Sequence, residues 1–498
     1  MSVSFPTIPS NLRVPLFWAE MDNSEANTTQ DSGPALLIGL ADTGSAIPTN
    51  QLTIMPSAAL AGKMAGRGSQ LARMVAKYRA VDPFGELWVI AVDEPEGESA
   101  TGKLTITGTA QASGTLSLYI STSRVQAAVV TGDEPATVAT ALAAAINASA
   151  DLPVTATADA GVVALTARHK GLTGNDIPLL MNYYGTVGGE TMPDGISVAV
   201  TAMSGGTGAP DLTGAVAAMG DEPFDFIGTP FSDSASLATM ALEMNDSSGR
   251  WSYVRQLYGH VYTAKIGTLS DLVAFGDTMN NQHITVAGYE PGVQTATDEL
   301  VALRTARNAV FIRNDPARPT QTGELTGALP ALAGKRFTLT EQQSLLSHGI
   351  ATAYTEGGVL RIQRDITTYQ KNAYGVADNS YLDSETLHTS AYVIRRLKSI
   401  ITSKYPRHKL ANDGTRFGAG QAVVTPAVLK GEMCASYRAM EREGVVENFE
   451  LFKKYLIVER NAADPNRVDV LFPPDYVNQL RVFALLNQFR LQYAGEEA

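Results

Sequence analysis

Histidine and cysteine are the residues with which this sequence could bind a metal ion, and their spacing does not favour such a site. The six histidines are scattered, with no two at the spacing of a metal-binding pair: His169, His260, His283, His348, His388 and His408. The single cysteine, Cys434, excludes a disulfide framework and a thiolate metal cluster. We therefore expect no metal centre and no bound cofactor.

A serine nucleophile is a second possibility. Ser232 and Ser234 follow a predicted strand, with Asp225 upstream and His260 downstream. A catalytic Ser-His-Asp triad on such a sheet usually places its serine in a G-x-S-x-G turn, which is absent around both serines. A serine hydrolase stays an alternative, which labelling by a serine-reactive probe would reveal.

Three glycines in the segment GKMAGRGS, Gly62, Gly66 and Gly68, look superficially like a phosphate-binding loop. The Gly-Lys-Ser/Thr element of such a loop is missing, and no strand leads directly into the segment. Chance spacing explains these glycines better, so we expect no nucleotide.

Positive charge is concentrated near the C-terminus of an acidic chain. The net charge is −12, but residues 376–498 carry a net +1, and residues 395–416 hold seven Lys or Arg against only Asp413. Two interpretations stay open for this run: a solvated helix face and loop, or an electrostatic contact with an acidic partner. A nucleic acid fits less well, because the run has few aromatic residues for stacking and the whole chain is acidic.

The elements that would position these residues form several domains, because 498 residues are too many for one hydrophobic core. Residues 26–97 and 206–375 alternate strands with helices, which predicts an α/β middle domain with a largely parallel sheet covered by helices. The predicted strands are 35–40, 86–92, 224–228, 251–254, 283–288 and 309–313. The predicted helices are 68–80, 234–248, 268–279, 295–307 and 340–348, the last capped by Thr340.

Residues 98–205 differ in composition from the rest of the chain. They hold 12 charged residues in 108 and three aromatic residues, and Thr, Ala, Gly and Ser dominate. Alternating β-strands with one helix at 136–148 predict a β-rich surface domain inserted into the chain, closed by a glycine-rich linker at 204–211.

Residues 376–478 predict an α+β C-terminal domain. Apolar residues at helical spacing from Leu387 to Ile401 predict one helix, with Asp383 or Ser384 as its cap, and a second helix covers about 425–443. Residues 449–460 and 467–472 then predict a hairpin.

An apolar strand stands alone at each end of the chain. In the N-terminal arm, 1–25, apolar residues alternate along 12–18, and the prolines forbid a helix. In the C-terminal arm, 479–498, Phe489, Leu491 and Tyr493 alternate with polar residues. An apolar strand without a neighbouring partner must pair elsewhere, within its own subunit or on another one.

No window of about 18 consecutive apolar residues predicts a membrane span. The first residues show no basic start followed by an apolar run, so we expect no secretory signal. With one cysteine, the composition favours assembly in a reducing cytoplasm.

Several segments together resemble contractile phage tail sheath proteins, particularly those of the Mu-like group. The strongest is DPNRVDVLFPPDYVNQLRVFALLNQFRLQY at 464–493. The N-terminal arm at 5–24, the loop NDPARPTQT at 314–322, and residues 366–383 and 409–418 are also similar to the family. No recognised motif falls in the insertion.

The resemblance implies a subtilisin-like α/β middle domain without a protease site, and a C-terminal domain completed by strands swapped between subunits. The donated strands would be about 10–20 and 479–493, and the receiving hairpin 449–472. The residues expected to exchange are Leu12, Val14, Leu16, Trp18, Leu480, Val482, Phe483, Phe489, Leu491 and Tyr493. The residues expected to receive them are Leu451, Tyr455, Ile457, Val468, Val470 and Phe472. The cations expected to face a tail tube are Arg395, Arg396 and Lys398.

The resemblance also implies a function without enzyme activity. Subunits would stack as hexameric rings in a helical sheath around a tail tube protein, with baseplate and tail terminator proteins as further partners. Contraction would drive the tube through the bacterial envelope for genome delivery, and the protein would lie in the virion tail. The sheath of a phage-derived bacteriocin or of another contractile injection system is the closest alternative; a monomeric adhesin, suggested by the insertion, is a more distant one.

Overall fold

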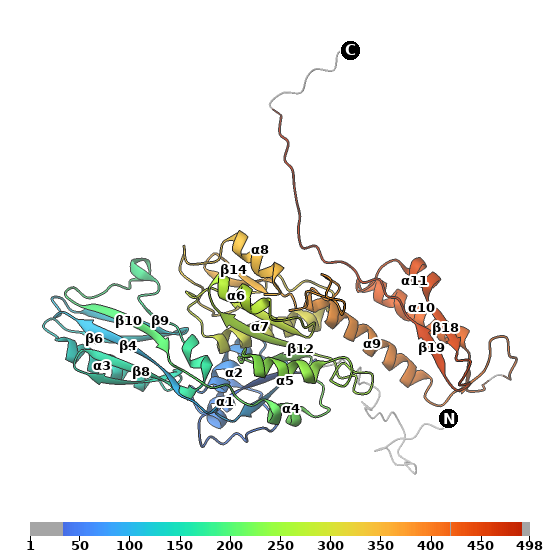
Figure 1. Cartoon of the computed structure of the whole chain (residues 1–498), viewed down its shortest axis with the longest axis horizontal. Helices are drawn as coiled ribbons and strands as arrows, with labels where there is room; N and C mark the ends of the chain where they lie inside the picture. Colours follow the sequence, from blue (N-terminus) through green and yellow to red (C-terminus); the bar gives the residue numbers. More distant parts are fainter. Residues whose placement is uncertain (1–32, 419, 491–498) are drawn as a thin grey trace, which may run out of the picture.

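The computed structural model describes residues 33–418 and 420–490. A six-stranded sheet lies near the middle of the elongated molecule (Figure 1). The strand order is β13-β12-β11-β1-β3-β2, and every pair is parallel except β2 with β3. The strands are β1 (Ala35–Leu40), β2 (Thr53–Ile54), β3 (Leu87–Val92), β11 (Phe226–Gly228), β12 (His260–Ile266) and β13 (Ile284–Tyr289). The prediction of a largely parallel sheet is confirmed.

Helices cover both faces of this sheet, because its strands are apolar on both sides. The neighbouring residues Leu36 and Leu37 of β1 belong to two separate hydrophobic clusters, one on each face. The first cluster includes residues of α1 (Ala58–Ala65), α2 (Gln70–Val81) and α7 (Thr297–Asn314). The second includes residues of α4 (Thr213–Met219), α5 (Ser234–Met244), α6 (Leu269–Gly276) and α8 (Leu339–Ser347).

Two predicted strands and one predicted cap of this region are wrong. Residues 309–313 belong to α7, which is buried on nearly all sides and so lacks the polar face that marks a helix in sequence. Residues 251–254 lie in turns, and β12, which the sequence analysis does not predict, completes the sheet. Helix α8 is capped by Thr338, in a reciprocal capping box with Glu341, and not by Thr340.

The segment between Ser99 and Ser204 forms two further sheets with a hydrophobic cluster of their own. The orders are β10-β4-β8-β7 and β6-β5-β9, and α3 (Pro135–Ala148) confirms the helix predicted at 136–148. The strands are β4 (Ser99–Thr107), β5 (Gly114–Ile120), β6 (Ser123–Val129), β7 (Val154–Asp159), β8 (Val162–Lys170), β9 (Leu179–Met181) and β10 (Ser197–Ser204).

This insertion packs closely against the rest of the chain. Gln294, just before α7, donates its Nε2 to the carbonyl oxygen of Ser121 at 3.1 Å. Gly68 has φ +83°, and a Cβ atom there would lie 2.5 Å from the carbonyl oxygen of Leu152. The glycines of the GKMAGRGS segment therefore include one that close packing requires, which is a structural reason for a pattern without a nucleotide.

The C-terminal part extends from the sheet on a long helix, α9 (Ser384–Lys404), seen in Figure 1. Helices α10 (Pro426–Arg442) and α11 (Phe449–Tyr455) pack with the hairpin β18 (Ile457–Arg460) and β19 (Val468–Leu471). Residues 449–455 are therefore helical and not part of the hairpin, because the Phe452 ring stacks on Tyr437 of α10 with 3.7 Å between centroids. Short pairs complete the architecture: β14 (Thr352–Glu356) with β15 (Val359–Arg364), and β16 (Lys409–Leu410) with β17 (Val423–Val424).

Candidate assembly site

The C-terminal arm returns from the hairpin to the sheet domain before it leaves the body of the subunit. Tyr476 forms an isolated antiparallel bridge with Val446, a residue of the loop that joins α10 to α11. Gln479 then donates its Nε2 to the carbonyl oxygen of Ala317 at 3.0 Å. Beyond Arg481 the arm runs away from all three folded parts (Figure 1).

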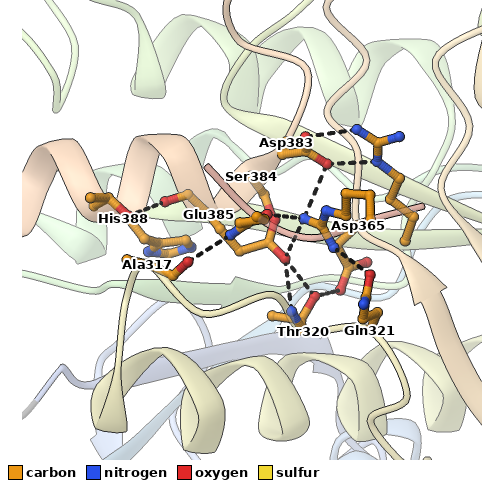
Figure 2. A network of polar contacts seen from close by, with 12 residues as sticks. Ala317, Thr320, Gln321, Asp365, Asp383, Ser384, Glu385 and His388 are labelled. Carbon is orange, nitrogen blue, oxygen red and sulfur yellow. Dashed lines mark hydrogen bonds and ion pairs between the residues drawn. The ribbon is translucent and has the colours of Figure 1, made fainter. Parts of the chain in front are cut away.

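Arg481 ties the arm to the start of α9. Its Nη2 lies 3.2 Å from Asp383 Oδ1 and 3.1 Å from Glu385 Oε1, and its Nη1 donates to Gln321 Oε1 at 3.3 Å. Gln321 in turn donates to the carbonyl oxygen of Leu480 at 3.2 Å. The Arg481 side chain is 11% exposed and that of Glu385 is fully buried. Figure 2 shows this network, with Asp383, Glu385 and Gln321 labelled.

The same carboxylates also bind groups from the sheet domain. Glu385 Oε1 accepts hydrogen bonds from the backbone nitrogen and hydroxyl of Thr320, at 2.9 and 2.8 Å. Asp383 is the N-cap residue of α9, but its side chain makes no capping bond and instead binds Arg364 in a bidentate pair at 2.8 Å. The predicted cap is thus correct in position, whereas its side chain binds two arginines.

A buried ion pair supports this site from the interior. Arg304 Nε lies 2.6 Å from Asp365 Oδ1, with side chains 1% and 0% exposed. Arg304 also donates to the Tyr289 hydroxyl at 3.0 Å and to the Thr352 carbonyl oxygen at 2.9 Å. The Thr320 hydroxyl lies 3.3 Å from Asp365 Oδ2, so one threonine contacts both the interior pair and the arm site (Figure 2).

The six charged groups at this joint balance: the carboxylates of Asp365, Asp383 and Glu385, and the guanidiniums of Arg304, Arg364 and Arg481. Burial raises the pKa of Glu385, and the Arg481 guanidinium opposes that rise. In the described part of the chain, no group of three His, Cys, Asp or Glu side chains is placed to hold a metal ion. What this arrangement can do is fix the positions of segments that lie far apart in sequence.

His388 makes the second contact of α9 with the sheet. Its Nε2 lies 2.9 Å from the Tyr262 hydroxyl, and its ring stacks on Phe226 with 5.1 Å between centroids. Burial lowers the pKa of His388 to about 4, so the ring is neutral at pH 7.

We expect the free energy of unfolding to fall as the pH drops from about 6.5 to about 4. In that window the unfolded chain binds a proton at His388 and the folded chain does not, so acid favours unfolding by about 3 kcal/mol at this residue. Thermal unfolding at several pH values measures the effect. His388→Gln should make the pH dependence shallower, with the contributions of the buried His169 and His260 remaining, whereas His408→Gln, at an exposed position, should leave it unchanged. An equally steep dependence in His388→Gln would contradict the prediction.

The arm beyond Arg481 exposes its apolar side chains. Residues 477–490 form no strand within the subunit, and Phe483 and Leu486 are 80% and 91% exposed. The exposed apolar residues of the arm are Leu480, Val482, Phe483, Leu485, Leu486 and Phe489. The other residues expected to exchange lie outside the described residues: Leu12, Val14, Leu16, Trp18, Leu491 and Tyr493.

The hairpin expected to receive strands pairs only within itself in the described part of the chain. Strands β18 and β19 form a two-stranded antiparallel sheet, so the outer edge of each has unpaired backbone groups. Ile457 and Val470 are exposed, Val468 is half-buried, and Phe472 packs in the C-terminal cluster. Leu451 and Tyr455 are also exposed but belong to α11, so their placement on a receiving strand is wrong.

Two of the three cations expected to face a tube bind carboxylates of their own subunit. Arg395 Nη1 donates to Asp225 Oδ2 at 2.7 Å, which joins α9 to the sheet domain. Arg396 pairs with Glu443, while Lys398 is exposed. Much of this end of the basic run therefore acts within the subunit.

The aspartate and the histidine considered for a hydrolase have other partners in the structure. The Asp225 carboxylate binds Arg395, and the buried His260 ring lies 2.8 Å from the Thr285 hydroxyl through its Nε2. A triad requires the aspartate to orient the histidine and the histidine to activate the serine. The observed bonds serve instead to pack β12 and α9.

Apart from Asp383, which it names only as a helix cap, the sequence analysis does not single out the charged residues of the joint. One signal could have found them, because three of the segments that carry the family resemblance meet there. Residues 314–322, 366–383 and 464–493 contribute Thr320 and Gln321, Asp383, and Gln479 and Arg481, respectively.

Three parts of the chain match known protein families. Residues 95–208 match the phage tail sheath protein beta-sandwich domain, 205–368 the central domain, and 376–490 the C-terminal domain. The chain is also 39% identical to the Mu-like prophage FluMu tail sheath protein of Haemophilus influenzae, across 99% of this chain and 100% of that protein. The chain belongs to the phage tail sheath family. It is Mu-like in sequence, and its role is that of a structural subunit of a contractile tail sheath.

Two solved structures that match most of this chain have low sequence identity and TM-scores below 0.5. The sheath tail protein of Desulfitobacterium hafniense is 14% identical with a TM-score of 0.49, and the match covers 94% of this chain and 97% of that one. A chain of the contracted anti-feeding prophage baseplate is 10% identical with a TM-score of 0.45, covering 97% and 100%. No helix in the described part of the sheath subunit is long and apolar enough to cross a membrane.

Proposed function

We propose that this sheath subunit polymerises helically around a tail tube by donating its terminal strands to neighbouring copies. The donated segments are residues 10–20 and 479–493, and the receiver is the hairpin of β18 and β19. The observation that carries the proposal is the C-terminal arm as far as residue 490, whose apolar side chains are exposed and which, over these described residues, pairs with no strand of its own subunit. Such a strand is stabilised when it adds to the edge of another sheet.

The dimensions and energies fit strand donation. A two-stranded hairpin is marginally stable by itself, so β18 and β19 gain from further strands. Residues 482–490 in extended form reach about 30 Å, which is enough to cross to a neighbour. Each backbone hydrogen bond contributes about 0.5–1.5 kcal/mol net, and several bonds in each arm make a strong link.

Donation from one copy to the next is a heterologous contact, which grows as an open helix. The subunits would stack as hexameric rings in an extended state that is trapped kinetically. A signal from the baseplate would release it, each ring would repack, and shortening would drive the tube through the bacterial envelope. The work would come from the free-energy difference between two packings of one sequence, without a nucleotide.

Lys398 is the remaining candidate for a contact with the tube. It is exposed on α9, whereas Arg395 and Arg396 are bound within the subunit. We expect Lys398→Glu to weaken assembly on isolated tubes, because it places a carboxylate where an acidic partner would bind. Polymerisation without tubes should be unchanged. Co-sedimentation with tubes measures the first effect, and normal co-sedimentation would contradict this placement.

The other parts of the subunit would have structural roles. The division into an N-terminal arm (1–25), a middle domain (26–97 and 206–375), an insertion (98–205), a C-terminal domain (376–478) and a C-terminal arm (479–498) follows the sequence analysis. The middle domain would be subtilisin-like without protease activity, and serine-reactive probes should leave it unlabelled. The partners of the sheath subunit would be the tube, baseplate and tail terminator proteins, and the sheath would assemble in the host cytoplasm. A bacteriocin sheath has the same mechanics, and genome context distinguishes it.

Electron microscopy of the purified full chain tests the proposal. Tubular polymers are the expected result, since the arms and the receiving hairpin are all on one chain. Monodisperse subunits at every concentration, checked by sedimentation, would overturn it.

A further inference from the structure

We infer that Arg481 is a positioning residue for strand donation, which ties the root of the C-terminal arm to the acidic start of α9 in its own subunit. The inference rests on the proposed donation of that arm. It adds that the donated strand leaves from a fixed point, at the joint between the sheet domain and the C-terminal part. The residues beyond Arg481 are then left to reach a neighbour.

Three consecutive residues at the start of the arm, Gln479, Leu480 and Arg481, bind the body of the subunit, and we call them the anchor. Gln479 binds the carbonyl oxygen of Ala317, Leu480 accepts a bond from Gln321 through its carbonyl oxygen, and Arg481 binds two carboxylates. Arg481 is 11% exposed, whereas Val482 and Phe483, which follow directly, are 79% and 80% exposed. Leu480 is also 70% exposed, so the end of the anchor is marked by the Arg481 side chain and its ion pairs.

The anchor depends on the charge of Arg481, because one of its partners is the buried carboxylate of Glu385. This carboxylate is fully buried and accepts hydrogen bonds from Thr320 and from the Arg481 guanidinium. If the arm root moved away, Glu385 would keep its bonds to Thr320 but lose a cation that lowers its pKa against the effect of burial. Leaving a buried charge without its partner is unfavourable, so the bound position of the arm root is strongly preferred.

The anchor also couples the arm to the joint. Asp383 and Glu385 begin α9, the helix that carries the C-terminal part. Arg364, at the end of β15, holds Asp383 from the sheet domain. A neighbour that pulls on the donated strand therefore acts on the start of α9, and a change in the direction of α9 redirects the strand. The Arg481 guanidinium thus links the strand donated to a neighbour with the direction of α9 within its own subunit.

The first test measures the mobility of the arm and does not depend on polymerisation. A nitroxide label at Ala484→Cys reports motion directly beyond the anchor. The labelled chain also carries Cys434→Ser, which removes the native cysteine, and Phe489→Asp, which is expected to keep the chain monomeric. We expect Arg481→Gln to make the label distinctly more mobile and Arg481→Lys to restore part of the order, because the charge is kept without the planar fork. The matched control is Arg318→Gln, which removes the same charge from an exposed position on the adjoining loop. Equal mobility in Arg481→Gln and Arg318→Gln would overturn the inference.

The second test measures assembly in chains with the native Phe489 and no label. We expect Arg481→Gln to raise the concentration needed for polymerisation about tenfold, because an unanchored arm loses its preorganisation. An unchanged threshold, together with a mobile arm, would overturn the positioning role. If Arg481→Gln fails to fold, Gln321→Ala serves instead, since it removes a neutral contact of Arg481 and leaves the charges balanced. Gln321→Ala should likewise raise the mobility of the label and the concentration needed for polymerisation. A native chain that forms no polymer would count against the proposed function, while the mobility test would still judge the anchor.

Discussion

Phe489→Asp should abolish tube formation by the purified chain without unfolding it. Phe489 is 76% exposed in the single subunit, so the substitution should change the free energy of unfolding by no more than about 0.5 kcal/mol. In a donated strand the same side chain would face the core of the receiving sheet, because Phe489 belongs to the apolar half of an alternating pattern. A carboxylate buried there without a partner is strongly unfavourable.

Gln488→Asp is the matched control, since it adds the same charge one residue earlier. Gln488 would point to the opposite face of the donated strand, where a charge can stay in water. Negative-stain electron microscopy and sedimentation should show tubes for the native chain and for Gln488→Asp, and none for Phe489→Asp. Circular dichroism should be the same for all three. Tubes of normal length from Phe489→Asp would refute donation of this strand in the expected register.

Arg304→Met should lower the free energy of unfolding by about 3–5 kcal/mol, the largest effect on stability that we expect from one substitution. The change leaves Asp365 fully buried without its cation and removes the bonds to Tyr289 and Thr352. Chemical denaturation of chains kept monomeric by Phe489→Asp measures the loss.

Arg318→Met provides the comparison for that experiment, because Arg318 is exposed and the substitution removes the same guanidinium. It should change stability by no more than about 0.5 kcal/mol. A double substitution, Arg304→Met with Asp365→Leu, should recover much of the loss, since no buried charge is then left unpaired. A loss below about 1 kcal/mol for Arg304→Met alone would show that the pair contributes little.

The errors in the predicted fold follow from what a local pattern can contain. Residues 309–312 are apolar, and two of them, Val310 and Ile312, are β-branched, yet they lie in α7, because a helix enclosed on nearly all sides has no polar face to mark its period. Residues 449–455 fit a strand as well as a helix over so short a span, and stacking of Phe452 on Tyr437 decides for the helix. Both outcomes depend on neighbours distant in sequence.

Local sequence patterns are enough to identify the family, the largely parallel sheet and the alternating apolar pattern of the C-terminal arm, because these features depend on periods of two and 3.6 residues and on contiguous motifs. The place where that arm is held follows from the folded structure alone. The anchor joins Arg481 to Asp383 and Glu385, nearly 100 residues earlier, and to Gln321, 160 residues earlier. Ion pairs between such distant segments have no periodic signature, since they form only when folding has brought the charges together and removed them from water.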